Sequence, residues 1–418
     1  MKSFMINSFP ISATQVGYSI YNEVQILKIM AKAYLAPYGV GLGHASRLIS
    51  ISEHLKKDNI IMKFSSFGEA VSYINNHGYE CARVPPIEFA WSNGGFSVKN
   101  SIANIPLWFA NFAKHVALET RNISTFDPNV VVSDSRLSPL VSSRILGIPS
   151  IVILNQIKLL LSPRIREFRA ARVFEKLNGE FFGNIWSMAE KLLIPDLPPP
   201  YTIAEHNIWN LESVKKKMHY IGFTTSKWQG DNQAINNVIH SLNLDRKKPI
   251  IFVHISGPRE TRLSLISTIM DASKYFRKEI QYIISEGKPN GSIIPKKLSS
   301  TGWYYEWCPV RDEIFQLTDL VVIRAGHEAI SHAIEHGKPV VSIPIQNHGE
   351  QIGNSEKIER LKIGIKLEAL SISPPQIAEA IHKILDDKSY LENVQRIKKI
   401  TDKYDGINNA LEIIRSFI

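Results

Sequence analysis

Apolar runs of strand length alternate with longer segments of helical periodicity from about residue 30 to the end of the chain. The runs KAYLAPYG (32–39) and PSIVILNQ (149–156) have the length and apolar content of buried strands. Between such runs, the segment 44–57 places Leu48, Ile51 and Leu55 on one face of a predicted helix. This alternation predicts an α/β architecture, with a parallel, doubly wound sheet and helices on both of its faces.

This alternation of predicted strands and helices occurs in two successive series along the chain. Prolines stiffen the segment PDLPPPYTI at 195–203, after which a new series of strands begins. A chain of 418 residues suits two domains. We therefore expect two Rossmann-like domains facing across a cleft, at 30–222 and 223–395, and a C-terminal helix at 396–418 that packs back on the first domain. The second series of candidate strands lies at 249–257, 280–287, 302–309, 319–326 and 338–345.

The first 29 residues do not show this alternation of strands and helices. They lack the compact apolar core and the cleavage site of a signal peptide. We expect a leader that is either disordered or the product of a misassigned start, with a short membrane-contacting arm as the alternative.

Composition narrows the function classes only slightly. The chain is 44% hydrophobic and 21% charged, which permits two full cores. Its formal net charge of +10 suits nucleic acid, an anionic membrane, acidic substrates or simply a basic surface. Two distant cysteines, Cys81 and Cys308, exclude a disulfide framework and favour a reducing compartment. No apolar run reaches eighteen residues, so we expect no transmembrane helix.

The turn after the first predicted strand carries the first candidate chemistry. Gly39, Gly41 and Gly43 lead directly into His44, where a helix is predicted to begin. The positive end of that helix disfavours a protonated imidazole, so a neutral His44 could act as a base. The alternative is a histidine that only caps or packs. The turn has neither the dinucleotide fingerprint GxGxxG nor the GK[ST] of a phosphate loop.

A carboxylate follows another parallel strand. Asp134 ends the run VVVSD, so it should lie at the same sheet edge as His44 and could orient the imidazole. The equally weighted alternative is that Asp134 caps the helix predicted to begin at Leu137.

The turns of the second domain contain groups suited to a nucleotide. Ser256, Gly257 and Arg262 combine a hydroxyl, an open backbone and a positive charge, as phosphate binding requires. Trp307 at a strand end could stack on a base, with packing as the alternative. The helix predicted to begin near 326–328 could receive a pyrophosphate. Polar groups for sugar hydroxyls come last: Glu350, Gln351 and Asn354.

Two of these stretches resemble a known family. RAGHEAISHAIEHGKPVVSIPI (324–345) with HGEQIGN (348–354) resembles the nucleotide-sugar signature of GT-B glycosyltransferases, and GVGLGH (39–44) resembles their glycine-rich turn with its catalytic histidine. The resemblance covers nearly the whole chain from about Met30. It is closest to the archaeal, family 28-like, lipid-linked β-1,4-N-acetylglucosaminyltransferases of N-glycan biosynthesis. These are similar to the bacterial lipid I GlcNAc transferase and to the eukaryotic two-subunit enzyme that forms chitobiose.

The resemblance implies the GT-B fold and an inverting, metal-independent reaction without a cofactor. GlcNAc would pass from UDP-GlcNAc to a polyprenyl- or dolichyl-pyrophosphate-linked GlcNAc, forming lipid-linked chitobiose. His44 would be the general base and Asp134 its partner. No aspartate pair of the DxD kind follows an equivalent strand, so no metal site is expected.

The resemblance also indicates which residues would bind the nucleotide sugar, and we call this set the donor wall. Arg262 would meet the diphosphate. Where the family usually has a glutamate for the ribose, this chain has His332, so either Glu328 substitutes or His332 itself bonds the ribose. The full expected donor set is Ser256, Gly257, Arg262, Trp307, Cys308, Val310, Arg324, Gly326, His327, Glu328, His332, Glu350, Gln351 and Asn354. The expected acceptor and glycine-turn set is Gly39, Gly41, Gly43, Asn155 and Trp108.

We expect the acceptor-binding side of the first domain to face lipid. The segment 155–177 interleaves basic with apolar residues, which suits an anionic membrane surface. We expect a peripheral protein at the cytoplasmic face of the cell membrane, and a homodimer is left open. An ordinary amphipathic helix on the core is the alternative for this segment. The alternative functions are a UDP-sugar transferase for another lipid such as diacylglycerol, a UDP-sugar epimerase, and an inactive nucleotide-sugar-binding subunit. No nucleic-acid motif appears.

Overall fold

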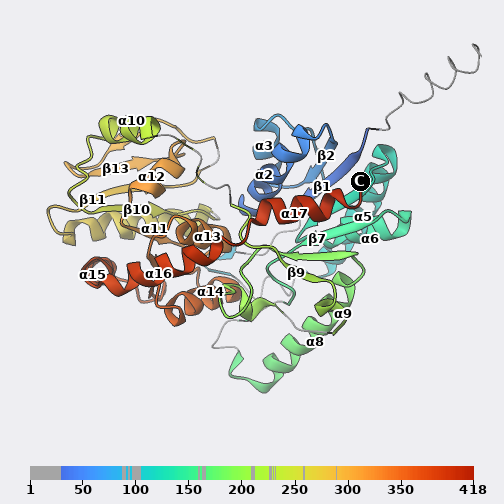
Figure 1. Cartoon of the computed structure of the whole chain (residues 1–418). Helices are drawn as coiled ribbons and strands as arrows, with labels where there is room; N and C mark the ends of the chain where they lie inside the picture. Colours follow the sequence, from blue (N-terminus) through green and yellow to red (C-terminus); the bar gives the residue numbers. More distant parts are fainter. Residues whose placement is uncertain are drawn as a thin grey trace, which may run out of the picture.

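The computed structural model describes residues 30–86, 91–92, 95–96, 105–158, 161, 166–208, 212–225, 228, 230, 232–257, 259–288 and 290–418. Within this part, two seven-stranded sheets form two α/β domains (Figure 1). The predicted leader at 1–29 lies outside the described residues.

The first sheet has the strand order β3-β2-β1-β6-β7-β8-β9, and every neighbouring pair is parallel. Its strands are β1 (Lys32–Pro37), β2 (Ile61–Ser66), β3 (Cys81–Arg83), β6 (Val130–Asp134), β7 (Ser150–Ile153), β8 (Lys191–Ile194) and β9 (Met218–Tyr220). A separate two-stranded antiparallel sheet is formed by β4 (Trp91–Ser92) and β5 (Gly95–Phe96). The helices of this half are α2 (Gly43–Lys57), α3 (Glu69–Asn76), α5 (Ile105–Phe126), α6 (Leu137–Leu146), α8 (Arg169–Trp186) and α9 (Glu212–Lys215).

The second sheet has the order β12-β13-β11-β10-β14-β15-β16, parallel except for the β12–β13 pair. Its strands are β10 (Ile250–His254), β11 (Gln281–Ser285), β12 (Lys296–Lys297), β13 (Gly302–Tyr305), β14 (Leu320–Ile323), β15 (Val340–Ser342) and β16 (Gly364–Lys366). Its helices are α10 (Asn232–Leu242), α11 (Arg259–Ala272), α12 (Arg311–Leu317), α13 (His327–Glu335), α14 (Gly349–Arg360), α15 (Pro374–Asp386) and α16 (Lys388–Thr401).

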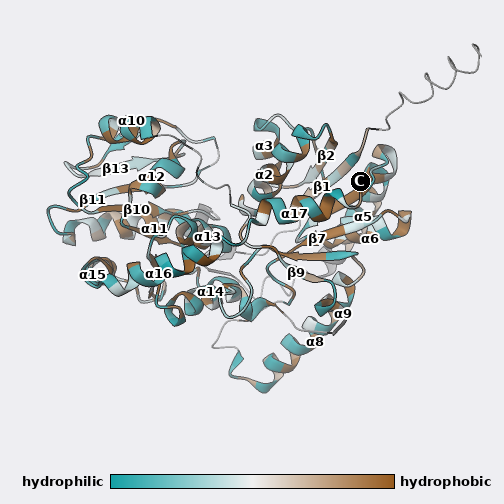
Figure 2. Cartoon of the chain, in the orientation of Figure 1, coloured by the Kyte–Doolittle hydropathy of each residue, from teal (hydrophilic) through white to brown (hydrophobic). Residues whose placement is uncertain are grey.

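The predicted apolar stripe of α2 is confirmed. Leu48, Ile51 and Leu55 are all fully buried and belong to the core cluster that also holds β1 and β2. Each such side chain contributes about 1.5–3 kcal/mol by leaving water. Figure 2 shows hydrophobic residues concentrated in the strands and hydrophilic residues along much of the outer helices. The stripe therefore fixes the helix directly behind the glycine turn.

The C-terminal segment differs from the expected single helix at 396–418. Helix α16 ends at Thr401 and packs Val394 and Ile397 into the second domain. Helix α17 (Gly406–Arg415) then begins, because the Asp405 carboxylate accepts a hydrogen bond from the Asn408 backbone N–H. Leu411 and the other apolar residues of α17 join the core of the first domain, where the helix lies beside α2 (Figure 1).

No helix in the described part of the chain combines the length and the apolar composition of a membrane span.

Candidate active site

A cavity of about 420 Å³ lies between the two domains and is lined by both of them. It sits where the strands of both sheets end, which is where open α/β sheets bind ligands. The sequence-predicted residues that line it are Gly41, Gly43, His44, Asn155, Ser256, Gly257, Arg262, Trp307, Cys308, Arg324, Gly326, His327, Glu328, His332, Glu350 and Gln351. Those outside its lining are Gly39, Asp134, Val310 and Asn354. The side chain of Trp108 is outside the described residues.

The glycine turn places His44 at the cavity. A Cβ on Gly39 would come within 2.3 Å of the Phe67 carbonyl oxygen, so only glycine fits there. Gly41 has a φ of +72°, which favours glycine. Helix α2 then begins at Gly43, so His44 stands in its first turn beside the Tyr38 ring, at a centroid distance of 5.8 Å.

Asp134 holds the His44 imidazole. In the sheet, Pro37 of β1 pairs with Asp134 of β6, so the turn after β1 begins beside this carboxylate. His44 Nδ1 lies 2.7 Å from Asp134 Oδ1, and Ser135 Oγ donates to the same oxygen at 3.1 Å. Asp134 is fully buried, whereas the His44 side chain is 24% exposed. The imidazole thus connects a buried carboxylate to the cavity.

The charge of Asp134 determines the tautomer of His44. Burial would raise the pKa of Asp134, but the adjacent Arg47 and His44 outweigh it, so the pKa lies below its ordinary value. An ionised carboxylate only accepts hydrogen bonds. His44 Nδ1 must therefore carry the proton, which leaves Nε2 with the lone pair when the ring is neutral.

Asp134 does not cap the following helix. The N-cap of α6 is Arg136, and no side chain makes a capping hydrogen bond there. The two interpretations of Asp134 left open by the sequence are thus distinguished by geometry, because its oxygens contact His44, Arg47 and Ser135.

Arg47 is a site residue that sequence reasoning missed. It lies one turn after His44 in α2, is 2% exposed, and donates from Nη1 to Asp134 Oδ2 at 3.0 Å. Its Nη2 lies 3.6 Å from Glu328 Oε2, in the second domain. The available signal was its spacing from His44, since residues three apart share a helix face.

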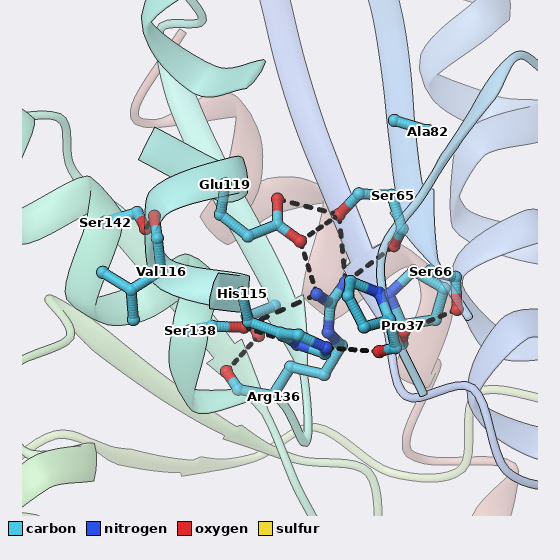
Figure 3. A network of polar contacts seen from close by, with 12 residues as sticks. Pro37, Ser65, Ser66, Ala82, His115, Val116, Glu119, Arg136, Ser138 and Ser142 are labelled. Atoms are coloured by element: carbon cyan, nitrogen blue, oxygen red, sulfur yellow. Dashed lines mark hydrogen bonds and ion pairs between the residues drawn. The ribbon is translucent and has the colours of Figure 1, made fainter. Parts of the chain in front are cut away.

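A buried charge network supports this sheet edge (Figure 3). Arg136 forms an ion pair with Glu119 of α5 and donates to the Ser65 carbonyl oxygen of β2 at 2.8 Å. Tyr34 of β1 donates from its hydroxyl to Glu119 at 2.5 Å. These residues come from distant parts of the chain, so no local spacing revealed the network. It ties α5 to β1, β2 and the segment that follows Asp134.

Arg262 is held in the first turn of α11, the helix that follows β10. It is 3% exposed and donates from Nη1 to the Gly257 carbonyl oxygen at 3.1 Å. Its Nη2 lies 3.5 Å from Glu286 Oε1. Gly257 has a φ of +109°, so a side chain there would be strained. A pre-positioned guanidinium beside open backbone suits an anionic group in the cavity.

The N-terminus of α13 opens on the same cavity. Gly326 is its N-cap, and Arg324, which directly follows β14, is 6% exposed. Burial lowers the pKa of Arg324 to about 10, so its guanidinium stays charged at neutral pH. His327 Nε2 lies 3.0 Å from Asp196 Oδ2, which anchors the ring to the proline-rich segment of the first domain. Helix N-terminus and guanidinium together favour anions.

The substituted histidine lies beside the alternative ribose ligand. His332 stacks on Phe315 at a centroid distance of 5.7 Å, and its Nε2 lies 3.8 Å from Glu328 Oε1. Burial first, and Arg311 next, hold the pKa of His332 well below its ordinary value. A neutral imidazole and a carboxylate therefore both line the cavity.

The remaining donor-wall residues divide into two groups. Trp307 and Cys308 line the cavity, and burial raises the pKa of the Cys308 thiol to about 12, so it is not a thiolate. Glu350 Oε1 accepts from Asn155 Nδ2 at 3.0 Å across the domains. Val310 instead packs on the second core, and Asn354 donates to the Ala325 carbonyl oxygen at 3.1 Å behind the cavity wall.

Gln351 also stabilises the turn that precedes α14, because its Oε1 accepts a hydrogen bond from the Ile345 backbone N–H at 2.8 Å. Over the described ranges, no cluster of three or more His, Cys, Asp or Glu side chains is arranged to hold a metal ion.

Known proteins resemble this chain in sequence and in fold. Residues 233–410 match the glycosyltransferase family 28 C-terminal domain. A protein of Methanosarcina acetivorans described as an uncharacterized glycosyltransferase is 25% identical over 391 residues, covering 91% of this chain and 97% of its own.

Solved structures share the fold over the same extent. The glycosyltransferase of kitacinnamycin has a TM-score of 0.64 at 15% identity, covering 93% of this chain and 99% of its own. The SsfS6 glycosyltransferase of Streptomyces sp. SF2575, complexed with thymidine diphosphate, has a TM-score of 0.60 at 15% identity, covering 92% and 99%. The fold is therefore GT-B, and the comparisons support a glycosyltransferase that takes its sugar from a nucleotide sugar, with a second domain of the family 28 type.

Proposed function

We propose that the protein transfers GlcNAc from UDP-GlcNAc to a polyprenyl- or dolichyl-pyrophosphate-linked GlcNAc, with inversion and without a metal ion, forming lipid-linked chitobiose for N-glycosylation. The observation that carries the reaction type is the His44–Asp134 pair, whose histidine lines the cavity opposite the donor wall. The choice of sugar and acceptor rests on the sequence resemblance and on the surface described below.

The catalytic step needs one base. The acceptor hydroxyl oxygen forms a bond to the anomeric carbon, its proton passes to His44 Nε2, and the bond from the anomeric carbon to the phosphate oxygen breaks. UDP leaves with the electron pair of that bond. Asp134 stabilises the imidazolium that forms, because its carboxylate is ionised and lies 2.7 Å away.

The leaving diphosphate needs charge stabilisation. Arg262, Arg324 and the N-terminus of α13 lie on the donor wall and supply it through fixed dipoles and guanidinium groups. Trp307 would lie against the uracil, and Glu328 or His332 would bind the ribose. Glu350 and Gln351 would contact the sugar. This set of donors is why no metal ion is required in the proposal.

An exposed apolar surface on α8 supports a lipid-linked acceptor. Phe168, which precedes the helix, is 69% exposed, and four apolar side chains of α8 are at least half exposed: Val173 (57%), Phe174 (50%), Leu177 (60%) and Phe181 (61%). We call these five residues the α8 surface. The opposite side of the helix packs Trp186 and its neighbours into the first domain.

Basic residues accompany the α8 surface. Arg169, Arg172 and Lys176 are exposed among the apolar side chains. In Figure 1, α8 lies at the edge of the molecule away from α15 and α10. Aromatic, aliphatic and basic groups together suit the interface of an anionic bilayer. A peripheral position at the cytoplasmic face of the cell membrane would bring the acceptor to the first domain.

A transfer assay tests the proposal. Purified protein is incubated with radiolabelled UDP-GlcNAc and a short polyprenyl-pyrophosphate-GlcNAc, and the product is tested for a β-linked disaccharide on lipid. Matched reactions contain UDP-glucose as donor or diacylglycerol as acceptor. A lipid-linked disaccharide formed only with the first pair supports the proposal. Transfer to diacylglycerol would support the alternative lipid acceptor, and UDP binding without any transfer would support an inactive subunit.

A further inference from the structure

We propose that Arg47 is a positioning residue that joins the His44–Asp134 pair to the donor wall, so that the base is completed when the two domains close on the nucleotide sugar. This inference rests on the proposed function. Its basis is that one buried guanidinium contacts a carboxylate in each domain, 3.0 Å from Asp134 Oδ2 and 3.6 Å from Glu328 Oε2.

Both helices that carry these groups approach each other at their N-termini. Arg47 lies one turn into α2, and Glu328 is the second residue of α13. A Cβ on Gly43 would stand 3.3 Å from Glu328 Cβ, so α2 and α13 meet there without intervening side chains. Glu328 is 19% exposed and lines the cavity, so it faces the donor as well as Arg47.

The Arg47 guanidinium has the shape to bridge the two carboxylates, Asp134 in the first domain and Glu328 in the second. Arginine presents separate N–H donors in a planar fork, so its two terminal nitrogens can hold two carboxylates at once. Here Nη1 points to the first domain and Nη2 to the second. A lysine at the same position would offer one ammonium and could favour only one of the two carboxylates.

Charge explains how the bridge affects the base. When the domains are together, Arg47 is shared by Asp134 and Glu328, so the two carboxylates exceed the one guanidinium. If the domains separate, Glu328 leaves and Arg47 alone neutralises Asp134. The surroundings of His44 are therefore more negative in the closed state, which favours transfer of a proton to the imidazole.

Other titratable groups face the same space. Tyr38 touches the His44 ring, and Glu69, Tyr73 and Arg311 line the cavity near it. His332 Nε2 also lies 3.8 Å from Glu328 Oε1, and the Glu328 charge acts on Arg311 and Tyr73, so Glu328→Gln alters these contacts as well. The coupling term of a double-mutant cycle isolates the contact between Arg47 and Glu328, because the separate effects of each substitution on other groups cancel in that term.

A double-mutant cycle tests the proposal. Arg47→Met, Glu328→Gln and the double variant are compared with the wild type in kcat, KM and the pH dependence of kcat/KM, with Lys57→Met on the exposed end of α2 as control. We expect Arg47→Met to lower kcat more than it raises KM, and Arg47→Lys to restore the rate only in part. The acid limb of the pH profile should move to higher pH in Arg47→Met and to lower pH in Glu328→Gln.

The two single effects should combine non-additively, by at least about threefold. The same cycle on UDP binding by calorimetry needs no acceptor, so it reports on the bridge even if the wild type transfers no sugar. Thermal unfolding shows which variants are folded. Additive effects in both cycles, or unshifted pH profiles in variants that fold, would overturn the role of Arg47. An inactive wild type with a coupled binding cycle would instead overturn the proposed reaction alone.

Discussion

At the scale of single residues, the hydrogen bond between His44 and Asp134 determines which imidazole nitrogen can accept a proton. The ionised carboxylate accepts a hydrogen bond from Nδ1–H at 2.7 Å, so Nε2 is left with the lone pair. A carboxamide in place of the carboxylate would reverse this, because its NH₂ group can donate to Nδ1.

We therefore expect Asp134→Asn to lower kcat/KM by about 10²–10⁴-fold, through the wrong tautomer and the loss of charge stabilisation. UDP affinity should change little, because Asp134 lies outside the cavity lining. Steady-state kinetics and calorimetry measure the two quantities. A folded Asp134→Asn protein that retains the wild-type rate would show that Asp134 has no catalytic effect.

The sequence predicted residues at this scale only where their local context was distinctive. The glycine turn and the end of a strand revealed His44 and Asp134. Arg47 was missed because its partners lie in two other elements, one of them in the other domain. Asn354 was predicted to hold the sugar, yet its amide lies behind the wall, since only the turn geometry near Ala325 decides which way it faces.

At the scale of elements, three histidines are packed around Phe315 between β10, α12 and α13. Burial lowers the pKa of His254 to about 3 and that of His336 to about 4, and holds that of His332 well below 6.5. Below pH 6.5, the unfolded chain binds protons at these positions and the folded chain does not. The free energy of unfolding should therefore fall as the pH is lowered from 6.5 towards 4.

His336→Phe tests this pH dependence. The substitution keeps an aromatic ring against Phe315, at 5.2 Å between centroids, and removes one titrating group. We expect the pH slope of unfolding stability to decrease by about 1.4 kcal/mol per pH unit. Urea unfolding between pH 7 and pH 5 measures it, with the exposed His240→Phe as control. An unchanged slope in His336→Phe would contradict the account of these histidines.

The α8 surface gives a second prediction at this scale. Phe174→Ser and Leu177→Ser should each weaken binding to phosphatidylglycerol-containing vesicles by about tenfold or more, because each removes a side chain that would leave water. Arg169→Gln should weaken binding at low salt only. Vesicle co-sedimentation measures the effect.

Ile294→Ser is the matched control, since Ile294 is 71% exposed in the second domain. UDP affinity should be the same in all these variants. Equal binding of the α8 variants and the wild type, or binding that does not depend on anionic lipid, would contradict a membrane role for the α8 surface.

At the scale of the whole molecule, the sequence predicted the fold well and the pairing of its domains poorly. Strand and helix periodicity is local, so β1, α2, β6 and five strands of the second sheet were found from their own residues: β10, β11, β13, β14 and β15. The short strands β8 and β16 were missed because three or four residues give little periodicity. The polar contacts across the domains, such as His327–Asp196 and Asn155–Glu350, depend on the folded arrangement and had no local signal.

These contacts explain how two separate sheets make one site. The chain leaves the first sheet after Tyr220 and returns to it with α17, whose Arg415 pairs with Asp58 at the end of α2. The donor wall and the His44 turn are thereby held on opposite sides of one cavity. We therefore expect His44 to deprotonate an acceptor that faces the nucleotide sugar held by the second domain.

The most direct test is GlcNAc transfer from UDP-GlcNAc to polyprenyl-pyrophosphate-GlcNAc in excess EDTA, comparing the wild type with His44→Ala and with the exposed control His240→Ala. We expect full activity of the wild type and of His240→Ala in EDTA, and a loss of about 10²–10⁴-fold in His44→Ala with UDP binding retained. Undiminished transfer by a folded His44→Ala protein would contradict the central claim that His44 is the base.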